Sequence, residues 1–168
     1  QYDFTVINTN NDILAFTITE FPGATIDIDT DTHNVNVFCS FDLESEISNI
    51  TNVITIPARA TINGPFTDYR SEVTYIVTSE SGVAQDWTMN LYNTNTTMSA
   101  YDFVGITEDA TDASLADFTV FFSYDELTDI SALVANCTLP HGASATIVAT
   151  GNQESGSTAN DFQNLVVY

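Results

Sequence analysis

Three aspartates at alternate positions are the first residues whose spacing could support chemistry. Asp27, Asp29 and Asp31 would project to one side of an extended strand, where their carboxylates could share a hard cation such as calcium. The spacing begins like the calcium loop of an EF-hand, but Thr32 stands where that loop needs glycine, and no glutamate follows at its closing position. We therefore favour a solvated acidic strand, expect no metal or other cofactor, and retain the three aspartates as a calcium candidate.

The cysteines and histidines do not form a recognisable catalytic or zinc-binding pattern. Cys39, Cys137, His33 and His141 are scattered without zinc-ligand spacing, and neither histidine accompanies a nucleophile motif. The carboxylates are so numerous that the sequence singles out no pair for glycoside hydrolysis. We expect buried free thiols, solvated histidines in turns, and a protein that is not an enzyme.

The charge balance excludes whole classes of partner. Among 168 residues, 23 are Asp or Glu and only 2 are Lys or Arg, so the formal net charge is -21. Such a surface repels nucleic acid and anionic membranes, and no apolar window is long enough for membrane insertion. The chain opens at Gln1, which we interpret as a mature or excised product. Possible glycosylation sequons at Asn49, Asn95 and Asn136 are compatible with export.

Short alternating runs of β-branched and aromatic residues, broken by Asn, Asp, Gly and Ser, predict an all-β fold. Residues 34–41 form the clearest run, with Val35, Val37 and Cys39 on one face and Phe38 as the exception on the other. Single helical turns or loops are expected at 42–50 and 125–133, and the strand spacing favours sandwiches. Further strands are predicted at 12–18, 53–56, 73–78, 86–92, 117–124 and 165–168.

An internal repeat organises the whole chain. It is visible in three pairs of segments: 3–6 with 86–89, 36–42 with 119–125, and 68–75 with 161–168. The first two pairs are 83 residues apart and the third 93, which places an insertion of ten residues near 151–160. We therefore predict two homologous β modules, at 11–93 and 94–168, preceded by an N-terminal extension at 1–10.

The two ends of this repeat do not match. After Tyr75 the first module continues through residues 76–92, which we interpret as a strand, a turn and a closing strand. The second module has no counterpart of these residues after Tyr168. Meanwhile residues 3–6 copy the closing strand ahead of the first module. We expect the second module to lack its closing strand at the sheet edge, and the extension to be a spare one.

A sheet that lacks a strand exposes unpaired backbone groups and can recruit an extended segment from another subunit. The candidate donor strand carries Tyr2, Phe4 and Val6 at alternate positions. Because donor and acceptor lie at opposite ends of one chain, the predicted partner is the chain itself, in a head-to-tail homopolymer. The candidate acceptor edge of the second module consists of Leu165, Val166, Val167 and Tyr168.

A family resemblance points the same way. Residues 75–82 followed by 85–88, and 157–162 followed by 166–168, resemble the tandem Ig-like modules of surface and secreted proteins in Bacteroidota. The resemblance implies small antiparallel β-sandwiches of stalks, adhesins or fibres, with no catalytic residues to carry over. The missing second closing hairpin departs from that family and is similar, in architecture alone, to pilins completed by a donor strand.

These observations predict a fold of two tandem Ig-like antiparallel β-sandwiches, the second lacking its closing strand. The predicted function is that of a structural subunit of an extracellular or cell-surface filament. One alternative is a fragment of a longer covalent array, in which residues 1–10 close a preceding module of a stalk or adhesin. Another is an accessory module that binds surface glycans or calcium.

Overall fold

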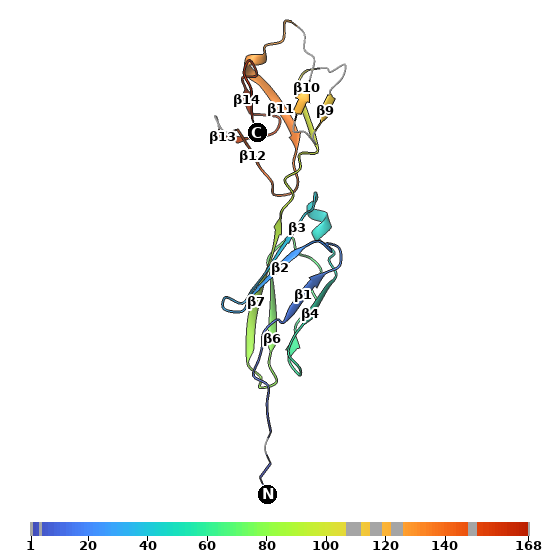
Figure 1. Cartoon of the computed structure of the whole chain (residues 1–168), viewed down its shortest axis with the longest axis vertical. Helices are drawn as coiled ribbons and strands as arrows, with labels where there is room; N and C mark the ends of the chain where they lie inside the picture. The colour runs from blue at the N-terminus through green and yellow to red at the C-terminus, as the bar shows by residue number, and fades with distance from the viewer. Residues whose placement is uncertain are drawn as a thin grey trace. The chain divides into compact units, whose positions relative to one another are not determined.

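The computed structural model describes residues 2–3, 5–106, 112–114, 119–121, 126–147 and 151–167, and for 112–114 and 119–121 it describes the backbone alone. The described chain is built of strands and two short 3₁₀ turns, which confirms the all-β prediction (Figure 1). It divides into two compact units, Gln1–Thr94 and Asn95–Tyr168. In the described part of the chain, no helix has the length and apolar character needed to cross a membrane.

The described residues of unit 1 form two sheets and one 3₁₀ turn, η1 (Glu44–Ile47). A two-stranded antiparallel sheet joins β1 (Ala15–Ile18) to β4 (Asn52–Thr55). A five-stranded sheet has the order β2-β3-β7-β6-β5, and its β3 and β7 pair in parallel. Its strands are β2 (Thr25–Asp29), β3 (Asn34–Cys39), β5 (Thr61–Ile62), β6 (Val73–Thr78) and β7 (Ala84–Asn93).

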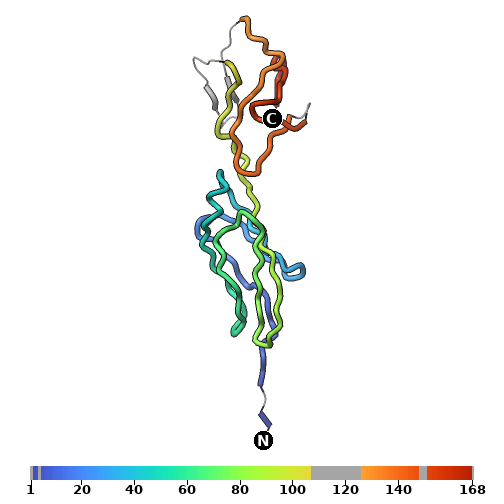
Figure 2. The backbone as a smooth tube through the Cα atoms, turned by 180° about the vertical axis from the view of Figure 1, so that it is seen from behind, coloured from blue at the N-terminus to red at the C-terminus, as the bar shows by residue number. Residues whose placement is uncertain are grey.

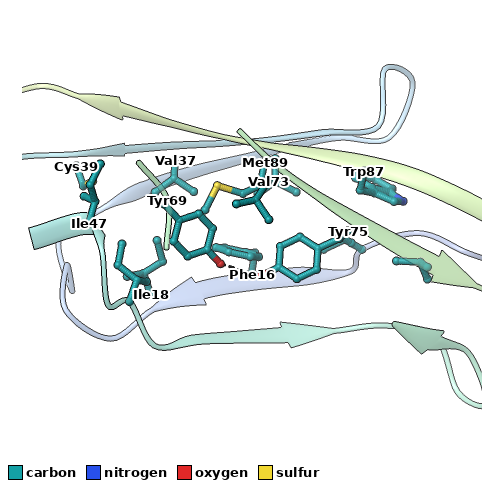
Figure 3. Close-up of a cluster of buried hydrophobic side chains, with 14 of the residues drawn as sticks. Phe16, Ile18, Val37, Cys39, Ile47, Tyr69, Val73, Tyr75, Trp87 and Met89 are labelled. Atoms are coloured by element: carbon teal, nitrogen blue, oxygen red, sulfur yellow. Dashed lines mark hydrogen bonds between the residues drawn. The ribbon is translucent and has the colours of Figure 1, made fainter. Parts of the chain in front are cut away.

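The core of unit 1 lies between its two sheets, as Figure 3 shows. The alternation predicted for residues 34–41 is confirmed, because Val35, Val37 and Cys39 are buried whereas Phe38 is 38% exposed. Trp87 of β7 is fully buried, and its indole N–H donates a hydrogen bond of 3.1 Å to the carbonyl of Asn11. This hydrogen bond ties Asn11, ahead of β1, to the core of unit 1.

The described residues of unit 2 form three small sheets and the 3₁₀ turn η3 (Ile130–Ala132). Its core consists of Phe103, Leu133 and Ala135, against which Phe162 packs edge-on at a centroid distance of 4.9 Å. The sheets are β14-β11-β8, β10-β9 and β12-β13. Their strands are β8 (Ala100–Phe103), β9 (Asp112–Ser114), β10 (Thr119–Phe121), β11 (Leu133–Thr138), β12 (Ala145–Ile147), β13 (Gly151–Gln153) and β14 (Ala159–Asn160).

Two antiparallel strand pairings recur in both units. The β2–β3 hairpin of unit 1 corresponds to β9–β10, and the β1–β4 pair corresponds to β8–β11. The turns η1 and η3 fall within the two segments predicted to form single helical turns. The sequence repeat therefore reflects a repeated arrangement of strands.

Candidate functional site

The N-terminal segment comprises residues 2–7, and its described residues, 2–3 and 5–7, project beyond the body of unit 1 (Figure 2). Tyr2 is 90% exposed, Val6 89% and Ile7 50%. Phe4, the third predicted donor side chain, lies outside the described residues. Asn8 is the first described residue of the chain to form hydrogen bonds within unit 1. The described residues of this segment therefore present exposed apolar side chains, and their backbone groups form no hydrogen bonds with the described structure.

Asn8 fixes the point at which this segment leaves unit 1. Its backbone N–H donates to Glu80 Oε2 at 3.0 Å, and its carbonyl accepts from the N–H of Ser81 at 3.2 Å. Arg59 Nη1 holds the other carboxylate oxygen of Glu80 at 2.6 Å. The hydrogen bond from Asn8, followed by that from Arg59, lowers the pKa of the Glu80 carboxyl. Sequence patterns could not reveal this anchor, because its members are far apart along the chain.

The C-terminal part of unit 2, which includes the predicted acceptor edge, repeats hydrogen bonds of unit 1 as far as Phe162. In unit 1 the N–H of Tyr69 donates to the carbonyl of Ile47 at 2.8 Å, and in unit 2 the N–H of Phe162 donates to that of Ile130 at the same distance. The aspartate before each aromatic residue accepts a hydrogen bond from the backbone N–H two residues later. These matched contacts support the alignment of 68–75 with 161–168.

Beyond this point the two units differ, and the strand predicted at 165–168 is not formed at its described positions. Leu165 is 90% exposed, Val166 is half-buried, and Val167 is 53% exposed. Tyr168 lies outside the described residues. In unit 1 the equivalent strand β6 pairs with both β7 and β5. A strand needs a hydrogen-bonded neighbour, and no described strand of unit 2 takes the place of β7 beside residues 165–167.

The place of the closing strand in unit 1 differs from the sheet edge expected for such a strand. In unit 1 the closing strand β7 lies inside the five-stranded sheet, between β3 and β6. It pairs in parallel with β3 and antiparallel with β6. Within the described residues of unit 2, β10, the counterpart of β3, pairs with β9 alone. By alignment, the counterparts of the two strands that flank β7 are β10 and residues 165–167.

The three candidate calcium ligands do not converge on one point. Asp27 and Asp29 lie on β2, and Asp31 lies in the turn that follows it. Asp29 Oδ1 instead accepts the backbone N–H groups of Asp31 and Thr32, at 2.9 and 3.1 Å. Contacts with Thr32 and then with Asp31 lower the pKa of the Asp29 carboxyl. Among the described residues, no group of three acidic, His or Cys side chains could hold a metal ion.

The cysteines and histidines do not form a shared site among the described residues. Cys39 is buried, and its burial raises the thiol pKa to about 11. Cys137 is only half-buried, because it lies near the end of β11, so the expectation of two buried thiols is wrong for this residue. His33 is half-buried, because its ring packs edge-on against the indole of Trp87 at 5.2 Å. His141 is exposed in a turn.

The three sequon asparagines lie at different depths. Asn49 is exposed, whereas Asn95 and Asn136 are half-buried. The side-chain oxygen of Asn95 accepts the backbone N–H of Thr97 at 2.9 Å. Asn49 is therefore the most accessible of the three for a glycan.

The chain matches no family model and no curated protein. Among solved structures, it is similar to a predicted secreted protein from Bacteroides fragilis, with 14% identity and a TM-score of 0.39 over 52% of this chain and 98% of that one. It is also similar to a predicted glycoside hydrolase from Bacteroides thetaiotaomicron, with 22% identity and a TM-score of 0.42 over 74% of this chain and 35% of that one. At these values neither similarity bears on function.

Proposed function

We propose that this chain is a structural subunit of an extracellular filament, in which the N-terminal segment of one copy completes unit 2 of the next. The observation that carries the proposal is that the N-terminal segment copies part of β7 in sequence, while its described residues, 2–3 and 5–7, are exposed and make no hydrogen bond to the described residues. In unit 1, β7 fills the interior of the five-stranded sheet. A second β7-like segment on the same chain has no such place in unit 1.

Burial supplies the driving force for this addition. Trp87 and Met89 of β7 are 0% and 1% exposed, and Phe4 and Val6 are their counterparts in the N-terminal segment. Burial of two such apolar side chains contributes about 1.5–3 kcal/mol each. Pairing also satisfies backbone groups on both sides of the added strand. These terms together favour an ordered strand over an exposed tail.

The position of donor and acceptor on different units of one chain supports head-to-tail polymerisation. The donor segment belongs to unit 1 and the acceptor strands to unit 2, so the contact is heterologous and each added copy brings a new acceptor. The acidic surface and the three sequons are compatible with export, and with a place outside the cell or on its surface.

The same spare strand also supports a second candidate, a longer covalent array in which residues 1–10 close a preceding module. The two candidates differ in the nature of the bond between successive modules. A strand donated between chains is held by burial and hydrogen bonds alone, whereas an array is one polypeptide.

The test is the intact mass of the natural protein after full denaturation, beside heated and unheated gels of the same sample. We expect one species near 18.3 kDa that runs as a ladder of multiples until it is heated. A mass far above this value would favour the covalent array. A monomer that forms no ladder at any concentration would contradict the filament.

A further inference from the structure

We propose that the donated strand inserts into the interior of the unit 2 sheet, between β10 and residues 165–167, and runs parallel to β10. The inference rests on the proposed function and adds the position, direction and register of the strand. Addition to an outer edge, and insertion in the opposite direction, are the alternatives that it excludes.

The direction follows from the pairing of β7 in unit 1. β7 runs parallel to β3, with Asn36 opposite Asn90, and antiparallel to β6, with Val73 opposite Met89. The β9–β10 pair repeats the antiparallel pairing of β2–β3, so β10 takes the place of β3. A strand that copies β7 in sequence should therefore copy its direction and run parallel to β10.

The register follows from the same alignment. Residues 3–6 match 86–89, and the next residue, Ile7, takes the place of Asn90. In unit 1, Asn90 lies opposite Asn36, whose counterpart is Thr119. Ile7 should then lie opposite Thr119.

On the other side of the strand, the β6 pairing sets the register. Thr88 lies opposite Thr74 in unit 1. The counterparts of these two residues are Thr5 and Val167, which should therefore lie opposite one another. The alternation of β7 then directs Phe4 and Val6 inward and Thr5 and Ile7 toward the outer face.

The anchor at Asn8 sets the length of the donated strand. The backbone N–H and C=O of Asn8 both bond within unit 1, to Glu80 and Ser81. The segment that can enter a neighbour without breaking these bonds therefore ends at Ile7. The donor is shorter than the N-terminal extension of residues 1–10 expected from the sequence.

Chain connectivity agrees with this direction. In unit 1, β7 leads directly into unit 2, whose first strand β8 begins at Ala100, 14 residues after Asp86. The donor segment likewise leads directly into unit 1, whose first strand β1 begins at Ala15, 12 residues after Asp3. In both cases a β7-like strand is followed by the first strand of the next unit, after nearly the same number of residues. A donated strand parallel to β10 would therefore make the junction between two subunits resemble the junction between units 1 and 2 in sequence order.

Disulfide trapping distinguishes these arrangements in the full chain. The first pair is Ile7→Cys with Thr119→Cys. In unit 1 the corresponding side chains touch, since Asn90 Nδ2 donates to Asn36 Oδ1 at 3.1 Å. The second pair is Thr5→Cys with Val167→Cys. All variants carry Cys137→Ser, and Cys39 stays because it is buried with a raised pKa.

The matched control joins Asp3→Cys to Thr119→Cys, which a reversed strand would bring together. In the parallel register, position 3 lies four residues, or about 13 Å, from the partner of Thr119. Each single-cysteine variant is run beside the pairs to verify that the ladder still forms.

We expect mild oxidation of either of the first two pairs to make the ladder resistant to heating until a reductant is added, with no such change in the control. Trapping of the control pair in place of the first two would overturn the parallel insertion while leaving the filament intact. A ladder in which no pair is trapped would also overturn it. Loss of the ladder in every variant, the wild type included, would contradict the proposed function itself.

Discussion

Replacing Val6 with Asp is expected to abolish assembly while leaving the subunit folded. Val6 is 89% exposed in the single chain, and its counterpart Met89 in β7 is 1% exposed. The substitution therefore costs the isolated subunit nothing but places a carboxylate in a core when the strand is donated. At about 4 kcal/mol for an uncompensated buried polar group, the affinity between subunits should fall roughly a thousandfold. Light scattering coupled to size-exclusion chromatography measures the loss.

The matched control is Val53→Asp. Val53 is 61% exposed on β4 and adds the same single negative charge when replaced. It should assemble like the wild type, and both variants should keep the wild-type midpoint of urea unfolding. Equal loss of polymer in both variants would attribute the effect to charge, and unchanged assembly of Val6→Asp would exclude this segment as the donor.

Replacing Trp87 with Ala is expected to destabilise unit 1 by about 3–5 kcal/mol. The indole is 0% exposed, packs edge-on with His33, and donates its N–H to the carbonyl of Asn11. The substitution leaves a cavity in the core beneath the sheet and removes the hydrogen bond to Asn11. Trp87 is the only tryptophan, so urea unfolding has to be followed by far-UV circular dichroism.

Tyr92→Ala provides the comparison on the same strand. Tyr92 is 47% exposed and stacks on Phe38 at a centroid distance of 5.1 Å. Loss of this exposed pair should cost about 1 kcal/mol. Equal destabilisation by the two substitutions would contradict the assignment of Trp87 to the centre of the core.

The sequence predicted the positions of strands along the chain better than it predicted which strands lie beside one another in the sheets. Alternation identified β3 and β6, because one face of each strand is buried and the other is not. Alternation describes only the two faces of a strand, however, and contains no information on which strand lies beside it.

The position of β7 illustrates this limit. As the last strand of its module it was expected at a sheet edge, but it lies between β3 and β6 because β3 accepts it in parallel. The same limit explains residues 165–167. Their composition suits a strand, but no described neighbour pairs with them, so local preference alone does not form one.

The candidate site was only partly accessible from the sequence. The internal repeat revealed that residues 3–6 copy residues 86–89 of the closing strand, since Asp, an aromatic residue and Thr recur in the same order. The boundary of the donor at Ile7 depends on contacts of Asn8 with Ala58, Glu80 and Ser81. Such contacts between distant segments are set by the tertiary fold and leave no local pattern.

The most direct test of strand donation is hydrogen exchange at the backbone amides of residues 2–7, compared between assembled and monomeric protein. The amides of the described residues 2, 3 and 5–7 have no hydrogen-bond acceptor among the described residues of the single chain, so they should exchange rapidly in the monomer. The account predicts strong protection of the same amides in the assembled protein. Rapid exchange of residues 2–7 within intact polymers would contradict it.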